Sequence, residues 1–407
     1  MTPWLHIVGI GEDGVDALRP VARATIDAAE ICYGGARHLA MLPTTFTGER
    51  RRWRTPLRDT FDEIKALTGR QVIVLATGDP MNFGIGATLI WELSDSIGPD
   101  AHSIIPAPGA FSLAAARMGW SLPETACLSI HGRPLSALAL HLFPGARLLI
   151  LSENETSPEK ISALLLDKGF GSSNVTVLSH LDGAGESVRT RSARDNVEDP
   201  DTGTARLNIV AVDCTADSGA RYFSRSGGLP DDAFEHDGQM TKQIVRAATL
   251  AALTPFPGAH LWDIGAGCGS VGIEWMRAGG QTTAVERAPK RRAMIARNAE
   301  ALGVPNLEIV AGEANASLPQ LKSPDAIFIG GGLTGGALLA NCHAALRPGG
   351  RLVANAVTIE GEALLTKAFE DWGGALNRIA ISTVNPVGRL HGWRAAMTVT
   401  QYAMTKP

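Results

Sequence analysis

The sequence predicts an α/β protein with two different domains in tandem. Strand-like apolar runs alternate with helix-like segments along the chain, and the alternation restarts after a short polar stretch near the middle. Each half also has its own glycine-rich loop directly after an apolar strand. At 407 residues the chain is longer than a single hydrophobic core supports. Because the strand-like runs are continuously apolar, we expect parallel sheets covered by helices on both faces.

The first half defines a domain at residues 1–213, followed by a small, polar linker at 214–220. In this domain we expect strands at 7–10, 31–33, 71–76, 103–106, 126–130, 146–151, 175–178 and 207–212, and helices at 15–29 and 111–117.

The second half, residues 221–407, forms the other domain. Thr241 has N-cap character before an amphipathic helix at 243–253. Strands are expected at 260–264, 282–285, 307–310, 326–329, 351–354 and 396–400. No internal repeat relates the two halves, so we treat them as different domains.

Composition and charge exclude several classes of function. Apolar residues make up 45% and charged residues 19%, no run approaches the roughly 20 apolar residues of a membrane span, and no signal peptide is evident. The net charge is −4 and the basic runs are limited to 50–52 and 290–292, which we interpret as solvated or ion-paired arginines. The five cysteines lack C-x-x-C spacing. We expect a cytoplasmic protein without metal, membrane or nucleic-acid partner.

The first glycine loop lies in the stretch LHIVGIGEDG, residues 5–14. It fits G-x-G-x-x-G, the pattern of a dinucleotide site. However, Glu12 and Asp13 occupy the turn where a pyrophosphate would need room and positive potential. We therefore interpret the match as a strand-to-helix turn that forms one wall of a cleft, where Gly9 and Gly11 let the backbone approach a ligand.

The second glycine loop, DIGAGCGSVG at 263–272, indicates the cofactor. Asp263 ends a strand, glycines follow at 265, 267 and 269, and Glu286 ends the next strand about 17 residues beyond Gly269. A carboxylate there suits a ribose diol, as in nicotinamide sites. A zwitterionic amino acid joined to adenosine fits this set better than a pyrophosphate, so the spacing favours S-adenosylmethionine (SAM). The predicted contacts are Asp263, Gly265, Ala266, Gly267, Cys268, Gly269, Glu286, Glu313 and Ala314, with Cys268 as a small loop residue rather than a nucleophile. The alternative is a turn whose glycines only allow close packing.

Longer stretches carry a family resemblance. Residues 221–275, which include RSGGLPDD, EHDGQMT and DIGAGCGSVGIEW, are similar to the decarboxylating methyltransferase domain of the cobalamin pathway. The first half resembles that pathway's partner methyltransferase in VGIGEDG, ICYGGARHL, ATGDPMNFGIG, FSLAAARMGW and LSIHGRP. Together they resemble the fused precorrin-6Y methyltransferases (decarboxylating) over essentially the whole chain.

The resemblance implies a two-lobed class III (tetrapyrrole) methyltransferase followed by a class I Rossmann-like methyltransferase, with one SAM in each. In the second domain it adds Thr241 to the SAM contacts. In the first it implies Gly9, Gly11, Gly78, Asp79, Pro80 and Gly109, with residues 131–133 also lining the cleft. Two departures are that Glu12 replaces the usual proline, and that Met81-Asn82 replace bulkier apolar residues.

The implied reaction is methylation of carbons 5 and 15 of precorrin-6Y, or of its reduced form (6B), with loss of carbon dioxide from the ring C acetate, which gives precorrin-8. Carbon 5 is assigned to the first half, and carbon 15 with the decarboxylation to the second. An enamine-like meso carbon is nucleophilic toward a sulfonium methyl group, so alignment and exclusion of water suffice. The family also implies a homo-oligomer.

A tetrapyrrole with many carboxylates favours arginine and lysine ligands. The candidates are Arg221, Arg225, Lys242, Arg246, Arg389 and Arg394, each of which is otherwise a surface cation. His236 is a candidate proton carrier or a turn cap, and Asp237 a carboxylate of the same turn.

Four other functions have less support in the sequence. An RNA methyltransferase is opposed by the negative charge and by the run DAIFIGGG at 325–332, which lacks the D/N-P-P-Y/F motif. A small-molecule methyltransferase of another pathway, a SAM-binding regulatory module and a nicotinamide-dependent dehydrogenase are weaker alternatives.

Overall fold

The computed structural model describes residues 3–200 and 203–407, which form two compact units. The first unit comprises Met1–Leu135 and Phe143–Arg221, and the second comprises Ser136–Leu142 and Tyr222–Pro407. The break at Arg221 adjoins the segment expected as a linker. Residues 136–142 differ from the expected assignment: they belong to the second unit, because Leu140 packs onto its apolar cluster around Leu302 and Val304.

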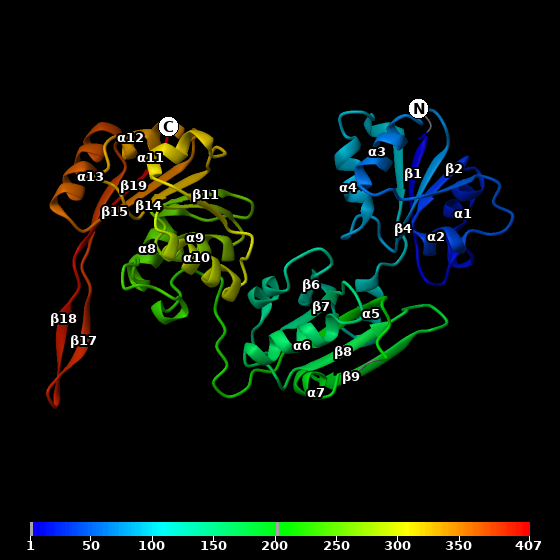
Figure 1. Cartoon of the computed structure of the whole chain (residues 1–407), viewed down its shortest axis with the longest axis horizontal. Helices are drawn as coiled ribbons and strands as arrows, with labels where there is room; N and C mark the ends of the chain where they lie inside the picture. The colour runs from blue at the N-terminus through cyan, green and yellow to red at the C-terminus, as the bar shows by residue number, and fades with distance from the viewer. Residues whose placement is uncertain (1–2, 201–202) are drawn as a thin grey trace. The chain divides into compact units, whose positions relative to one another are not determined.

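The first lobe of the first unit is a parallel sheet with the strand order β3-β2-β4-β1-β5. Helices α3 and α4 lie on one side of β1 and β4, and α1 and α2 on the other (Figure 1). The elements are β1 (Leu5–Ile10), η1 (Val15–Ala17), α1 (Pro20–Asp27), β2 (Ile31–Gly34), α2 (Ala36–Met41), β3 (Glu49–Arg52), α3 (Leu57–Lys65), β4 (Val72–Thr77), α4 (Ile85–Leu93), η2 (Pro99–Ala101) and β5 (His102–Ile105).

The second lobe is a mixed sheet with the order β6-β7-β10-β8-β9, in which only β6 and β7 are parallel. The expectation of parallel sheets throughout is therefore wrong for this lobe. Helix α5 packs its apolar face on the sheet through Phe111 and Ala114. The elements are α5 (Ala110–Met118), η3 (Leu122–Glu124), β6 (Ala126–Ser129), β7 (Arg147–Leu151), α6 (Ser157–Asp167), β8 (Asn174–Ser179), β9 (Ser187–Ser192), α7 (Ala193–Glu198) and β10 (Asn208–Asp213). The 3-10 helix η4 (Leu135–His141), between β6 and β7 in sequence, belongs to the second unit from Ser136 onward.

The helix expected at 15–29 is divided in the structure. A 3-10 turn at Val15–Ala17 is followed by α1, which begins at Pro20. Arg19 has extended backbone angles, φ −57° and ψ 148°. A proline disfavours the α conformation of the preceding residue and lacks a backbone N–H, so it begins a helix and does not continue one.

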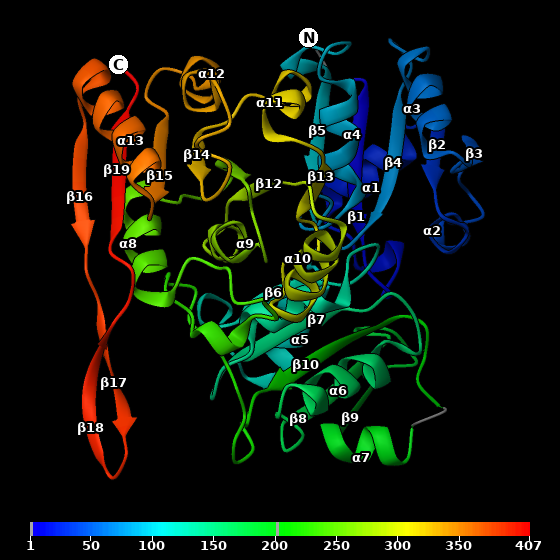
Figure 2. The same ribbon diagram turned by 60° about the vertical axis from the view of Figure 1, so that its left-hand side comes forward.

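The second unit is built on a seven-stranded sheet with the order β13-β12-β11-β14-β15-β19-β16 (Figure 2). The five strands from β13 to β15 are parallel, whereas β19 runs antiparallel to β15 and β16. Its elements are η5 (Asp231–Ala233), α8 (Gln243–Leu253), β11 (His260–Ile264), α9 (Ser270–Arg277), β12 (Gln281–Glu286), α10 (Pro289–Ala301), β13 (Glu308–Ala311), α11 (Ala314–Ser317), η6 (Leu318–Gln320), β14 (Ala326–Ile329), α12 (Leu338–Ala345), β15 (Arg351–Ala356), α13 (Ile359–Trp372), β16 (Ala375–Ile379) and β19 (Val399–Thr405).

Both faces of this sheet are apolar, as the continuous strand runs predict. Successive side chains of a strand alternate between faces. Trp262 and Ile264 of β11 pack in the core with α12 and α13, while Leu261 packs in the core with α8 and α9. Asp263 also faces the α9 side, where it accepts a hydrogen bond from Gly272. The fold thereby buries an acidic side chain between β11 and α9.

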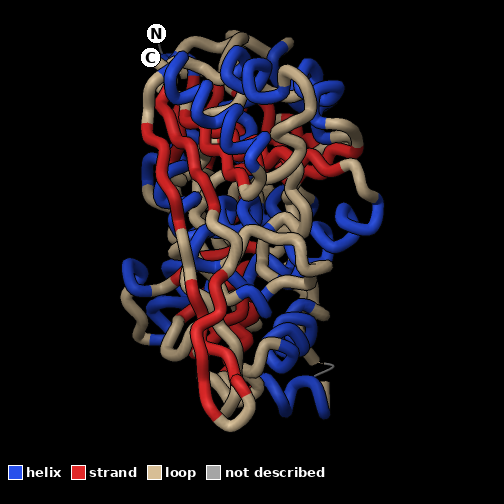
Figure 3. Tube along the Cα trace, turned by 90° about the vertical axis from the view of Figure 1, so that its left-hand side faces the viewer, coloured by secondary structure: helices blue, strands red, loops and turns tan. Residues whose placement is uncertain are grey.

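A two-stranded ribbon extends from the sheet between β16 and β19. It consists of β17 (Ser382–Val387) and β18 (Leu390–Ala395), paired only with each other (Figure 3). The strand expected at 396–400 begins at Val399, because residues 396–398 connect the ribbon back to the sheet. Five apolar side chains of the ribbon and its connection are exposed, namely Val384, Val387, Leu390, Trp393 and Met397.

In the described part of the chain, no helix combines the length and apolar character needed to cross a membrane.

We predict that Gly9→Ala destabilises the first unit. A Cβ atom at residue 9 would lie 1.9 Å from the carbonyl oxygen of Gly78 and 2.7 Å from the amide nitrogen of Ala107, which are backbone atoms that must shift. Overpacking of this kind costs about 1–3 kcal/mol of unfolding free energy, measurable by urea denaturation. Gly98→Ala is the matched control, because nothing lies within 4 Å of its Cβ position. Equal urea midpoints for the two variants would contradict the assigned packing.

Candidate functional site

The first unit contains a cavity of about 340 Å³ between its two lobes. Gly11, Glu12 and Gly78 reach it from loops that follow β1 and β4 of the first lobe. Leu178 of β8 and Ile209 of β10 reach it from the second lobe. Its lining also includes Arg37, Thr77, Phe83, Pro108, Ser129, His131, Arg133, Ser152, His180 and Asn208. The walls therefore combine an apolar floor with a few charged groups, as small-molecule sites commonly do.

The glycines of the first lobe allow three loops to pack on one another. β4 and β5 flank β1 in parallel, so the loops after these strands meet at one edge of the sheet. Gly9 has no room for a side chain because the Gly78 carbonyl occupies that space, and a Cβ at Gly78 would lie 2.8 Å from Gly109. Gly9 thus has a packing role, and it also lines a small cavity with Gly11, so its expected contact with a ligand stays a prediction. Gly11 lines the cavity. Asp79 and Gly109 line a neighbouring cavity of about 250 Å³, while Pro80 packs under Gly84 and Gly86.

Glu12 is held by a polar network at the cavity wall. It is one of the two acidic residues that argue against a pyrophosphate in the first glycine loop. Its Oε1 accepts a hydrogen bond from Arg37, and its Oε2 lies 2.9 Å from Nδ1 of His180. Arg37 also donates to Thr77 Oγ1 at 3.1 Å. Burial and the neighbouring Arg37 lower the pKa of His38 to about 4, so this second histidine is neutral at physiological pH. The loop therefore presents a neutralised carboxylate instead of room for phosphate.

Two of the cavity residues have strained backbones. Phe83 has φ 56° and His180 has φ 50°, in the left-handed region that residues with a Cβ seldom adopt. The guanidinium of Arg133 lies 4.5 Å from the centre of the Phe83 ring, a cation–π distance. Strained residues collect at functional sites when surrounding contacts hold them. Their presence here supports a functional role for this cavity.

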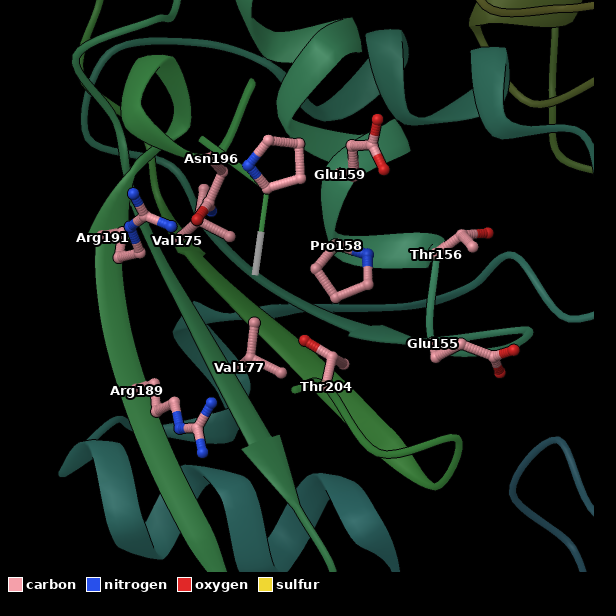
Figure 4. Close-up of a pocket in the computed structure, with 11 residues that line it drawn as sticks. Glu155, Thr156, Pro158, Glu159, Val175, Val177, Arg189, Arg191, Asn196 and Thr204 are labelled. Atoms are coloured by element: carbon pink, nitrogen blue, oxygen red, sulfur yellow. The ribbon is translucent and has the colours of Figure 1, made fainter. Parts of the chain in front are cut away.

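A second cavity of the first unit, of about 190 Å³, lies on the opposite face of the second sheet (Figure 4). Val175 and Val177 of β8 line it, whereas Leu178 lines the interlobe cavity, and neighbouring side chains of a strand point to opposite faces. The sheet thus separates the two. Its charged lining includes Glu159 of α6 and Arg189 and Arg191 of β9.

In the second unit, the glycine loop between β11 and α9 surrounds a buried carboxylate. Asp263 is 1% exposed, and its Oδ2 accepts the Gly272 amide at 2.9 Å. Its Oδ1 has no hydrogen-bond partner among the described residues. Burial, with a smaller contribution from Glu286, raises the pKa of Asp263 to about 7. An unpaired buried carboxylate is costly, and a cationic ligand would relieve that cost.

Glu286 lies beside this loop at the end of β12. Its two oxygens accept the amides of Gly267, at 3.0 Å, and Ala288, at 2.8 Å. A carboxylate has about four lone-pair positions, so two remain for hydroxyl donors. Gly265 is required by backbone contact, since its Cβ would lie 2.8 Å from Gly331 and its φ is 67°. The observed groups fit a ligand that carries both an ammonium group and a diol.

The remaining predicted cofactor contacts lie in three places. Ala266 and Cys268 are in the glycine loop, and burial raises the pKa of the Cys268 thiol, as expected for a packing residue. Glu313 immediately precedes α11, Ala314 begins it, and the exposed Glu313 pairs with Arg287. The prediction that Thr241 is the N-cap of α8 is wrong: the N-cap is Lys242, without a side-chain cap.

Arg246 does not have the exposure that a substrate ligand needs. It is fully buried, and its guanidinium donates to Glu274 at 2.5 Å, to Asp231 at 3.1 Å, and to two backbone carbonyls. Glu274 in turn accepts the amides of Gly228 and Leu229. This ion pair therefore fixes the RSGGLPDD segment beneath α8, which corrects the interpretation of Arg246 as a carboxylate ligand.

The other predicted cations are dispersed. Arg225 lies 3.2 Å from His141 and Lys242 lies 3.9 Å from Asp231, while Arg221 is exposed and has a polar or charged contact of its own. Arg389 and Arg394 are exposed on the β17–β18 ribbon and pair with no carboxylate among the described residues. The structure thus does not gather the six residues at one place.

His236 and Asp237 form an exposed turn next to the glycine loop. His236 Nδ1 accepts the Gly238 amide at 3.0 Å, and Asp237 accepts the Gln239 amide at 3.1 Å. Arg291 donates to Asp237 at 2.8 Å, which lowers the pKa of that carboxyl. The carbonyl of Gln239 then lies 3.5 Å from the Cβ position of Gly267. These contacts favour the turn-cap role of His236.

Sequence reasoning missed the pairing of Glu12 with Arg37 and His180. The available signal was His180 itself, a histidine directly after an apolar strand, but the contact spans 168 positions of sequence. Among the described residues, no group of three or more His, Cys, Asp or Glu side chains is placed to hold a metal ion.

Known proteins resemble both halves of the chain. A family described as tetrapyrrole (corrin/porphyrin) methylases matches residues 4–195, and one described as a precorrin methyltransferase domain matches residues 232–406. The chain is 46% identical over 409 residues to the precorrin-6Y C(5,15)-methyltransferase (decarboxylating) of Sinorhizobium sp, covering 100% of this chain and 97% of that protein. A Mycobacterium tuberculosis protein of the same name is 39% identical, covering 98% of this chain and 99% of its own. The crystal structure of the C-terminal domain of precorrin-6Y C5,15-methyltransferase from Rhodobacter capsulatus is 45% identical, covers 45% of this chain and 100% of that one, and has a TM-score of 0.44.

We predict that Asp263→Asn changes how stability depends on pH in the ligand-free protein. Because the folded-state pKa is raised to about 7, the native protein keeps a proton that the unfolded chain releases near its ordinary value of 3.8. Wild-type stability therefore falls as pH rises through this window, whereas the variant does not titrate there. Between pH 5 and 7 the variant should gain on the order of 1–3 kcal/mol relative to wild type. Denaturation at both pH values measures this, with exposed Glu370→Gln as control. A pH-independent difference would contradict the assignment.

Proposed function

Because the chain belongs to the precorrin-6Y C(5,15)-methyltransferase (decarboxylating) family, we propose that it methylates carbons 5 and 15 of precorrin-6Y, or of its reduced form, and removes carbon dioxide from the ring C acetate. The product is precorrin-8, an intermediate of cobalamin biosynthesis. The observation that carries the proposal is the 46% identity to a relative over 100% of this chain and 97% of that protein. The separate cavity and glycine loop in the two units support it further.

We propose one SAM-binding site in each unit. In the second unit, the unpaired Oδ1 of Asp263 would accept hydrogen bonds from the ammonium group, and the free lone pairs of Glu286 would accept the ribose hydroxyls. In the first unit, the cofactor would lie against Gly11, Gly78 and Pro108 in the interlobe cavity. When bound, SAM supplies an electrophilic sulfonium methyl group. The protein contributes orientation of the nucleophilic carbon and exclusion of water.

The two chemical steps are divided between the units in this proposal. The first unit methylates carbon 5, and the second methylates carbon 15 and removes carbon dioxide. Decarboxylation needs an electron sink, which the conjugated imine of the macrocycle provides, so neither unit needs a separate cofactor for it. Acetate and propionate groups of the substrate would pair with accessible cations. In the first unit Arg133 is such a cation, because it faces the cavity and has no carboxylate partner among the described residues.

Two further properties belong to the proposal. The five cysteines are free thiols, four of them buried, which supports a reducing cytoplasmic location. The neutralised Glu12 argues against the nicotinamide alternative, since the loop offers a carboxylate where a pyrophosphate would bind.

The proposal predicts that the full chain, given SAM and reduced precorrin-6Y, yields a product with two added methyl groups and one carbon dioxide lost. Mass spectrometry of the tetrapyrrole with and without SAM measures this. In Gly267→Asp, the new carboxylate would compete with SAM beside Glu286, so calorimetry should give one SAM per chain instead of two.

The control for this variant is Gly349→Asp. Gly349 has a similar left-handed backbone, φ 77° against 62° for Gly267, and nothing lies within 4 Å of its Cβ position. It should bind two SAM molecules. Undiminished carbon dioxide release by Gly267→Asp would contradict the division of steps.

We also predict that the β17–β18 ribbon mediates self-association. An isolated pair of strands is marginally stable in water, and this one exposes Trp393 (76%) and Leu390 (75%). A second copy of the chain would cover them. Sedimentation should show an oligomer that Trp393→Ser with Leu390→Ser dissociates. The control is Trp91→Ser, which removes a Trp exposed to 74% on α4. A monomeric wild type would contradict the prediction.

A further inference from the structure

The interlobe cavity of the first unit holds a histidine whose two nitrogens have different surroundings. Nδ1 of His180 lies 2.9 Å from Oε2 of Glu12, while Nε2 has no hydrogen-bond partner among the described residues. The carboxylate of Glu12 is only 16% exposed, and Arg37 donates to its other oxygen. A carboxylate beside one imidazole nitrogen fixes the proton there and leaves the other nitrogen as a base. Arg37, Glu12 and His180 thus form a chain in which each group orients the next.

We propose that His180 is the proton acceptor for methylation at carbon 5, with Glu12 and Arg37 as its positioning residues. This inference rests on the proposed function of the first unit. His180 lies on the wall of the cavity that also includes Gly11, Gly78 and Pro108, the backbone expected to border the methyl donor. Both reactants would therefore meet in front of its imidazole.

The reaction requires such an acceptor. The enamine electron pair of the macrocycle forms the new carbon–methyl bond, and the sulfur–methyl bond breaks with its pair remaining on sulfur. The methylated ring is then an iminium, and its N–H proton must leave to restore a neutral imine. Nε2 of His180 takes this proton and later releases it to solvent. The balance is one methyl group gained and one proton lost by the substrate.

The strained backbone supports a functional role. His180 has φ 50°, and Gly183 in the same turn approaches so closely that a Cβ would lie 2.9 Å from Cβ of Glu12. The turn after β8 is thereby pressed against the loop after β1, which brings the imidazole to the carboxylate. Strain of this kind persists when surrounding contacts determine it.

The other charged groups nearby are largely balanced. Asp182 and Glu186 in the turn that contains His180 both pair with Arg117, each at 2.6 Å. The titratable and charged groups that surround His180 are Glu12, Arg37 and His38 from the first lobe, Arg117, Asp182 and Glu186 from the second, and His131 and Arg133 on the cavity wall. His131 also lines the cavity, but no carboxylate orients it among the described residues.

The test compares full-length wild type with His180→Asn, chosen because asparagine tolerates a left-handed backbone. Single-turnover methylation at carbon 5 is followed by mass spectrometry across pH. The wild-type rate should rise with pH to a plateau. His180→Asn should lower the rate about 10²–10⁴-fold and abolish this acidic limb. Glu12→Gln should also lower the rate, because the amide no longer fixes the proton on Nδ1 of His180.

A second readout does not depend on turnover. In ¹⁵N-histidine NMR spectra, the signal that disappears in His180→Asn should show a proton on Nδ1 and a bare Nε2, and Glu12→Gln should remove this preference. SAM affinity by calorimetry should change less than about twofold in His180→Asn. The inference would be overturned if the rate of His180→Asn still rose with pH at the acidic end of the profile. It would also be overturned if this variant bound SAM more weakly and kept its pH dependence, or if His131→Gln lost the pH dependence instead. A wild type that never methylates carbon 5 would contradict the proposed function itself.

Discussion

Backbone contact between loops at the ends of parallel strands is the constraint on which both candidate sites depend. In the first unit, the loops after β1, β4 and β5 approach until Gly9 meets the carbonyl of Gly78 and Gly78 meets Gly109. In the second, Gly265 meets Gly331 in the same manner. Side chains are excluded from these contacts, so the polar groups next to them are fixed by rigid backbone. The positions of Glu12 and Asp263 depend on these contacts, because Glu12 lies shortly after Gly9 and Asp263 lies shortly before Gly265.

The two units treat the acidic group at this edge in opposite ways. Glu12 accepts hydrogen bonds from Arg37 and His180, so its negative charge is balanced by side chains of the protein itself. Asp263 is buried with one oxygen unpaired, and burial raises its pKa to about 7. A paired carboxylate can orient a neighbour, whereas an unpaired buried one favours a cationic ligand. The same residue class therefore supports two different tasks on one chain.

The sequence was most informative where local rules determine structure. The helix at Gln243–Leu253 and the strands at His260–Ile264 and Ala326–Ile329 have their predicted bounds, because their apolar periodicity and flanking breakers agree. The second lobe was mispredicted as parallel, since strand direction depends on how loops cross the sheet and not on residue pattern. Arg246 shows the same limit at a site: its charge suggested a surface ligand, but its partners Glu274 and Asp231 lie 28 and 15 positions away. The burial of Arg246 could not be predicted from the sequence, because it depends on partners that come together only in the folded structure.

The proposed assignment of the carbon 5 reaction to the first unit agrees with the position of a histidine that a carboxylate orients. Methylation of a neutral enamine leaves a cation, which must lose either a proton or another electrofuge. At carbon 15, carbon dioxide can leave from the ring C acetate and give its electron pair to the cationic macrocycle, so that step does not itself demand a protein base. At carbon 5 no such group departs, and the ring proton has to be removed. The first unit has a histidine held by a carboxylate, whereas His236 in the second unit caps an exposed turn. A positioned proton acceptor is thus present in the unit whose assigned reaction requires one.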